Sequence, residues 1–400
     1  MLLVLATVPA DADAQRAGEV PRRPRLTADA DTNDARAYLA LGEQRIQDRP
    51  REAADAFYWA YPLNPTLSDA LYGRYTALLM TNPQRLVLYW EGDRRTVRHP
   101  EVMAIDSLYF RALTLDPFLY RKFEAALFRM YLERWARQEI DRSGGMRVGE
   151  AEVQRFVSEL LLNAGPYIRA RESYARGRFP DALRLYDDAL RQARRKSAMR
   201  AERGRMHAHL RNWQPALADF TQALEEMRRE DQRDLVYLYE SKALLEHGIG
   251  MLHERMANLP AAREAYGRAL TEELSFYPAH VRLATLALTE GDTATAMAEY
   301  ALAAETTSEP SVLYVYGAIL AQTGRYDEAA TQFQRLTQTA PFYADAWFGL
   351  AMVRDAQGDG PAAVEAYRGF LARATRNHGR RAHADQRVQA LGAPAAGATQ

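Results

Sequence analysis

The chain has 400 residues, 52 basic and 52 acidic side chains, and no cysteine. A net charge of zero provides no overall field that would draw the protein to nucleic acid or to an anionic membrane. The absence of cysteine excludes disulfides, thiolate metal sites, a cysteine nucleophile and a lipoprotein anchor. Alanine, leucine, glutamate and arginine dominate and alternating β-branched runs are missing, so the composition favours an all-helical protein.

Residues 1–14 have the form of a short signal peptide. Residues 1–10 are apolar, and the Ala-Asp-Ala of residues 12–14 resembles a signal-peptidase site, although no basic residue precedes Arg16. Arginine makes up 49 of the 52 basic residues, a bias typical of a GC-rich bacterial genome. We therefore expect a bacterial protein that is periplasmic or secreted, with mature chains beginning near Gln15 on N-terminal sequencing. A frayed terminus on a cytoplasmic protein is the alternative.

The next segments are a lead-in and a helical region. Residues 15–34 are rich in Pro, Arg, Asp and Ala, which predicts disorder. Residues 35–142 read as helical, with one long helix expected over 118–142. No stretch beyond the N-terminus approaches the roughly 20 apolar residues of a membrane span.

From residue 163 onward a 34-residue period organises the chain. Six sets place a small residue, an aromatic residue four positions later and a small or apolar residue seven positions later, with one step of 46 and one of 33. The sets are Ala182, Tyr186 and Ala189; Ala216, Phe220 and Ala223; Ala262, Tyr266 and Ala269; Ala296, Tyr300 and Ala303; Ala329, Phe333 and Leu336; and Ala363, Tyr367 and Phe370. The small residue allows two helices to approach closely, and the aromatic ring fills the space between them. Glycines stand where the chain must turn, at Gly177, Gly291, Gly324 and Gly358.

This pattern resembles the tetratricopeptide repeat (TPR) family, whose period is 34 residues. The resemblance implies an all-α protein, an α-solenoid of stacked antiparallel helix pairs that forms a TPR superhelix. Its expected parts follow one another along the chain. They are a degenerate TPR-like region at 35–142, in which Tyr38, Gly42, Ala54 and Tyr58 fit one unit; a helix and two repeats at 143–224; an insertion that lengthens helices at 225–242; four repeats at 243–377; a capping helix at 378–392; and a disordered tail at 393–400.

The search for chemistry finds little. The eight histidines are scattered, and no His-Glu-x-x-His, phosphate-binding loop or dinucleotide-binding glycine motif is present. His-Gly-Ile-Gly at 247–250 suggests a glycine loop, but Gly250 occupies the same repeat position as Gly204 and Gly317. We therefore expect no enzyme activity, no cofactor and no metal site.

In TPR proteins the first helix of each repeat lines a concave groove that takes up a peptide or a helix. The candidate groove residues at the fifth and ninth positions of these helices, with one at the twelfth, are Tyr167, Arg171, Tyr174, Arg205, His247, Met251, Tyr314, Phe348 and Met352. The lysine–asparagine clamp of chaperone-binding TPR domains is absent, so that function does not carry over. Two arginines flanked by tyrosines favour an acidic peptide. The pattern also leaves open that several of these side chains pack between neighbouring repeats.

The sequence thus predicts a non-catalytic scaffold that binds a protein or peptide partner in the TPR groove. The alternative is an accessory or regulatory subunit of an envelope enzyme or of a secretion or assembly complex, docking through residues 35–142. Neither interpretation involves nucleic acid or a membrane span. The partner is not identified by any motif.

Overall fold

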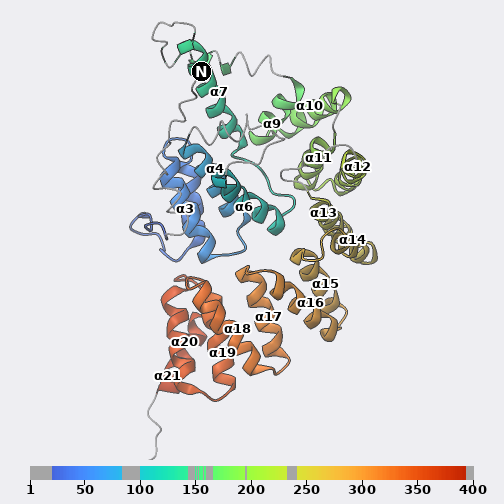
Figure 1. Ribbon diagram of the computed structural model, residues 1–400. Helices are drawn as coiled ribbons and strands as arrows, with labels where there is room; N and C mark the ends of the chain where they lie inside the picture. Colours follow the sequence, from blue (N-terminus) through green and yellow to red (C-terminus); the bar gives the residue numbers. More distant parts are fainter. Residues whose placement is uncertain are drawn as a thin grey trace, which may run out of the picture.

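The computed structural model describes residues 20–82, 100–142, 149, 151, 153–155, 157, 158, 165–193, 196–231 and 241–392. Throughout these residues the regular elements are helices, and no strand occurs (Figure 1). The prediction of an all-α fold is therefore confirmed. The candidate signal peptide and the tail at 393–400 lie outside the described residues.

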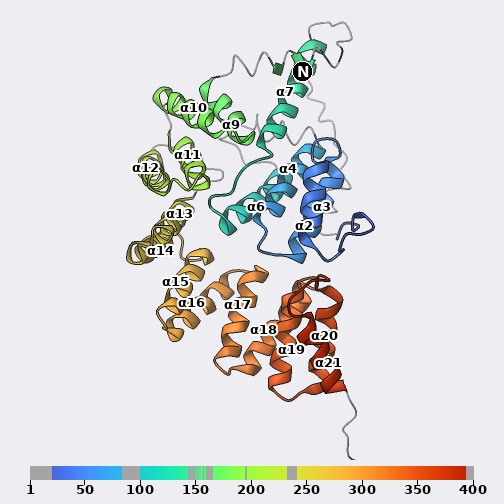
Figure 2. The same cartoon turned by 180° about the vertical axis from the view of Figure 1, so that it is seen from behind.

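Antiparallel helix pairs follow one another from α9 to α20, and each pair packs on the next. In Figures 1 and 2 they form an arc, with the N-terminal helices on its open side. The pairs are α9 (Pro166–Ala175) and α10 (Phe179–Gln192); α11 (Ser197–His209) and α12 (Trp213–Asp231); α13 (Lys242–Arg255) and α14 (Leu259–Glu272); α15 (Tyr277–Thr289) and α16 (Thr293–Thr306); α17 (Pro310–Gln322) and α18 (Tyr326–Thr339); and α19 (Ala344–Ala356) and α20 (Gly360–Arg373).

Every pair turns at the same register position through a residue with positive φ. The four predicted turn glycines have φ between 72° and 79°, and the other two pairs place Arg211 (φ 61°) and Ala257 (φ 58°) there. The following N–H reaches back five residues to close the first helix, as in the bond from the Arg325 N–H to the Leu320 carbonyl (2.9 Å). The repeat register is confirmed at all six turns, including the two that carry a side chain.

The register aromatic of one pair is held between glycines of two successive first helices. Phe333 is the clearest case, because a Cβ added at Gly317 or at Gly349 would lie 3.0 or 2.5 Å from its ring. Gly250 contacts Tyr266 in the same way. The interpretation of Gly250 as a packing glycine is therefore confirmed, and its motif is no phosphate loop.

The N-terminal helices are α2 (Ala35–Arg45), α3 (Pro50–Leu63), α4 (Ser68–Thr81), α6 (Pro100–Leu115) and α7 (Glu124–Arg142). The first three repeat the glycine–aromatic packing, with Phe57 between Gly42 and Gly73. The predicted aromatic, Tyr58, is wrong by one residue, because Phe57 is the fully buried ring and Tyr58 is half-buried. The packing glycine of the first helix precedes the buried aromatic by 15 residues here and by 16 residues in the later pairs. A position counted with the later spacing therefore falls one residue too far along the chain.

Two further expectations for this region are wrong. Within the segment 15–34 that was expected to be disordered, residues 20–34 make specific contacts: Trp59 donates from Nε1 to the Pro21 carbonyl at 2.9 Å, and Asn33 bonds to residues near the other end of the chain. Residues 15–19 lie outside the described residues. The helix expected from residue 118 begins only at Glu124. Pro117 ends the preceding helical run and the Asp116 carboxylate accepts from the Phe118 N–H at 2.9 Å, which stabilises a turn.

The remaining predicted parts concern helix length and the C-terminal end. α12 has 19 residues, whereas the other second helices have 14, and residues 232–240 of the predicted insertion lie outside the described part. α21 (Arg381–Gly392) packs on the last pair through Val388 and Leu391. Among the described helices, none is long and apolar enough to cross a membrane.

Candidate partner-binding surface

We call the surface formed by the first helices of the six pairs the inner face. The predicted groove residues differ widely in exposure on it. Tyr174, Arg205 and His247 are buried, Tyr167, Arg171, Met251, Tyr314 and Phe348 are half-buried, and Met352 is 43% exposed. The segments that cover the buried groove residues determine which part of the inner face is available to a ligand.

The segment between α6 and α7, residues 116–123, covers the first two helix pairs, and we call it the inner strap. Arg205 donates from Nε to the Pro117 carbonyl at 2.9 Å. The Phe118 ring packs edge-on against Phe220, with centroids 5.8 Å apart. The strap therefore places a backbone carbonyl and an aromatic side chain on α11 and α12.

Tyr120 fixes the strap to the turn of the first pair. Its hydroxyl donates to the Tyr174 carbonyl (3.0 Å), and its ring lies 5.1 Å from that of Tyr174 and 4.9 Å from that of His209. Burial of this half-covered phenol raises its pKa. The contact combines aromatic packing with a satisfied hydroxyl, the usual requirement for a buried tyrosine.

A buried ion pair completes the strap. The Arg121 guanidinium lies 2.6 Å from a carboxylate oxygen of Glu202 in α11, and the two side chains are 9% and 8% exposed. Tyr186 donates a hydrogen bond to the same carboxylate at 2.8 Å. Burial by itself raises the pKa of Glu202, but Arg121 and then Arg171 hold that pKa well below its usual range. Both partners are therefore charged at neutral pH.

These contacts correct the predicted cationic patch. Arg205 is 1% exposed and donates its hydrogen bond to the Pro117 carbonyl. Arg171 lies over the Tyr167 ring (5.5 Å) and close enough to Glu202 to lower the pKa of that carboxyl. The expectation of two exposed arginines is wrong for Arg205, because the strap covers this side chain and lies where a bound peptide was expected.

The N-terminal helices also reach the later pairs. The Arg111 guanidinium bonds to Glu309 at 2.6 Å, and the Tyr61 hydroxyl donates to the same buried carboxylate. Burial and the Glu309 charge raise the pKa of Tyr61, so its hydroxyl stays protonated. The Trp59 ring meets Phe342 at 4.8 Å between centroids.

The described N-terminus contacts the end of the last pair. Asn33 donates to the Ala372 carbonyl at 3.1 Å, and the Arg376 N–H donates to the Asp31 carboxylate at 2.5 Å. The N-terminal region therefore bridges the first and the last helix pairs, as the arc in Figure 2 shows. Its described residues close the chain into a ring of contacts.

The inner face of the last three pairs is only partly covered. Arg380, just before α21, donates to the Tyr314 hydroxyl at 3.3 Å and lies 4.9 Å from the Phe348 ring. Leu288 and Met352, in contrast, are 38% and 43% exposed although they are large and apolar. We call the surface around these two residues the open inner face.

His247 provides a pH-dependent contribution to stability. Burial, aided by Arg282, lowers the pKa of His247 to about 3. The unfolded chain takes up this proton below about pH 6.5 while the folded chain does not, so stability falls as pH drops from 6.5 towards 3. Between pH 7 and pH 5 we expect wild type to lose about 2 kcal/mol more unfolding free energy than His247→Leu, measured by urea denaturation. Equal losses would contradict this assignment.

Within the described ranges, no group of three or more His, Asp or Glu side chains is placed to hold a metal ion. The inner strap was not predicted from the sequence. The signal that could have found it is Asp116-Pro117, which breaks the helical pattern just before a run of large side chains.

The chain is similar to a known family and to several solved structures. A family model described as tetratricopeptide repeat matches residues 168–231, 247–311 and 317–378. No curated protein matches the chain. Among solved structures, yeast Tom70 is 15% identical, with 90% of this chain and 89% of that chain covered and a TM-score of 0.42.

Two further solved structures are similar in fold. The C-terminal part of a TPR repeat-containing protein from Cytophaga hutchinsonii is 13% identical, with 56% of this chain and 95% of that chain covered and a TM-score of 0.43. YrrB, described as a TPR protein with an unusual peptide-binding site, is 19% identical, with coverages of 51% and 100% and a TM-score of 0.39.

Proposed function

The chain belongs to the tetratricopeptide repeat family, whose model matches residues 168–231, 247–311 and 317–378, and on that premise we propose that it holds an extended partner polypeptide on its open inner face. Proteins of this family are protein–protein interaction scaffolds and are in general non-catalytic. Stacked repeats create extended concave surfaces that suit this role.

The observation that carries the proposal is the inner strap. Residues 116–123 lie on the first two pairs in the manner of a bound peptide. The pairs contact a backbone carbonyl, aromatic rings and one buried charge of this segment. The same chain therefore already holds a non-helical segment on this kind of surface. Because the strap occupies the first two pairs, a partner would bind on the later ones.

The chemistry of the open inner face indicates the kind of partner. Leu288 and Met352 are exposed apolar side chains, and methionine adapts its shape to different ligands. The nearby Asp355 carboxylate is already paired with Arg387 at 2.6 Å. The surface therefore favours a segment with apolar side chains over a strongly charged one.

Site-specific photo-crosslinking in the native host tests this proposal. A photoreactive phenylalanine analogue at position 288 or 352 is expected to capture the same protein from cells. The matched control is position 302 on α16, because Leu302 is 44% exposed but lies on a second helix. Equal capture at all three positions, or none at 288 and 352, would contradict the proposal.

The alternative is docking through residues 35–142. This region already uses Trp59 and Arg111 for contacts within the chain. Phe110 is 37% exposed and offers a test of this alternative. Capture of a partner from position 110, without capture at 288 and 352, would favour the accessory-subunit interpretation.

A further inference from the structure

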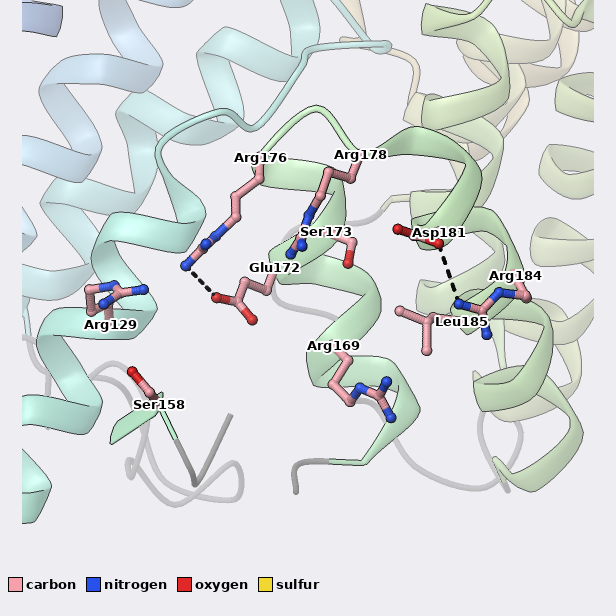
Figure 3. A pocket seen from close by; sticks show the side chains of 10 residues that line it. All are labelled: Arg129, Ser158, Arg169, Glu172, Ser173, Arg176, Arg178, Asp181, Arg184 and Leu185. Atoms are coloured by element: carbon pink, nitrogen blue, oxygen red, sulfur yellow. Dashed lines mark hydrogen bonds and ion pairs between the residues drawn. The ribbon is translucent and has the colours of Figure 1, made fainter. Parts of the chain in front are cut away.

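A cavity of about 360 Å³ lies between α7, α9 and α10, and neither Leu288 nor Met352 of the open inner face lines it. Figure 3 shows its arginine-rich lining: α7 contributes one arginine, and the others come from α9, from the turn that follows it and from α10. The arginines are Arg129, Arg169, Arg176, Arg178 and Arg184. The acidic residues among its described lining are Glu172 and Asp181.

These two carboxylates neutralise only part of the lining. Glu172 pairs with Arg176 at 2.7 Å, and Asp181 pairs with Arg184 at 3.3 Å (dashed in Figure 3). Arg169 and Arg178 have no carboxylate partner among the described residues. Among the described residues, Arg129 bonds to an uncharged amide oxygen of Gln154, at 3.5 Å, and to no carboxylate. Three positive charges at the cavity are therefore without a counter-charge in the described lining.

The surrounding sequence accentuates this charge. Residues 165–211 carry 13 Arg or Lys against five Asp or Glu, whereas the whole chain has a net charge of zero. Like charges around one cavity repel one another, and a bound anion removes that repulsion. Four of these basic residues, Arg169, Arg176, Arg178 and Arg184, line the cavity.

We propose that this cavity binds a phosphoryl group. A phosphoryl ester carries a charge of about −1.5 to −2 at pH 7 and three acceptor oxygens, which matches several guanidinium donors better than one carboxylate does. Arginine presents a planar fork to such oxygens. The Ser173 hydroxyl, which also lines the cavity, adds an uncharged donor. The source is either free phosphate or a phosphorylated side chain.

Isothermal titration calorimetry on the full chain at low salt tests the proposal. The probes are inorganic phosphate, inorganic pyrophosphate, phosphoserine and citrate, the last providing charge without phosphorus. The test variant is Arg169→Gln with Arg178→Gln. The control is Arg36→Gln with Arg368→Gln, which changes the same charge at two exposed arginines that do not line this cavity.

We expect pyrophosphate to bind wild type and the control alike, and the test variant to lose about tenfold or more in affinity. Tighter binding of phosphoserine than of inorganic phosphate would assign the source to a phosphorylated chain, and the reverse order to a free phosphate. Citrate binding as tight as that of pyrophosphate, equal losses in both variants, or no pyrophosphate binding would overturn the proposal. None of these outcomes depends on crosslinking at the open inner face.

Discussion

Glu202→Gln is expected to lower the unfolding free energy of the N-terminal half by about 3–5 kcal/mol. The substitution keeps the size of the side chain but removes its charge, which leaves the buried Arg121 guanidinium without a counter-charge. Removing one partner of a buried ion pair is costly because the other charge remains in a poorly solvated site. Urea denaturation followed by circular dichroism measures the change.

The double variant Arg121→Met with Glu202→Leu is the control for this prediction. It replaces both charges by apolar groups of similar volume, so we expect most of the lost stability to return. Hydrogen exchange should also show faster exchange at residues 116–123 in Glu202→Gln than in the double variant. If both variants are equally stable, the ion pair does not hold the strap.

Phe220→Ala is expected to cost about 3–5 kcal/mol, as for other fully buried phenylalanines. A Cβ added at Gly204 or at Gly248 would lie 2.6 Å from this ring, so the ring fills the space between α11 and α13. The strap residue Phe118 packs on the same ring. Because backbone lies on both sides, the cavity left by the ring cannot collapse easily. Urea denaturation measures the loss.

Phe118→Ala is the matched comparison for Phe220→Ala. Phe118 is only half-buried and belongs to the strap, so its removal should cost less and leave the repeats folded. A loss below about 1 kcal/mol for Phe220→Ala, or a larger loss for Phe118→Ala, would show that the register assigned to the repeats is incorrect.

Together, these contacts describe a solenoid whose first part is occupied by its own chain. The strap residues contact α11 and α12 from about 80 to 100 positions away in sequence, as in the bond between Arg205 and Pro117. Weakening the strap should therefore expose additional inner face rather than unfold the repeats. A partner of the open inner face could then extend onto the first two pairs.

The repeat architecture was predictable from the sequence because its determinants are local. A glycine or small residue, an aromatic ring and a fixed turn recur within each 34-residue unit, and each unit contacts only its neighbours. The turn glycines therefore appeared at the expected places, with φ near 75°. Even Arg211 and Ala257 follow the register, although their side chains conceal it. In α3 a shift of one residue was enough to misplace the aromatic position at Phe57.

What occupies the inner face was decided only by the tertiary structure. From its position in the repeat, Arg205 was predicted to face the groove. In the structure it donates to a carbonyl 88 residues earlier in the chain. Asn33 meets Ala372 across 339 residues, and no periodic pattern links them. Helical periodicity reports which face of a helix is apolar or small, because that depends on residues three and four apart. It carries no information on which distant segment covers that face, since this depends on how the whole arc curves.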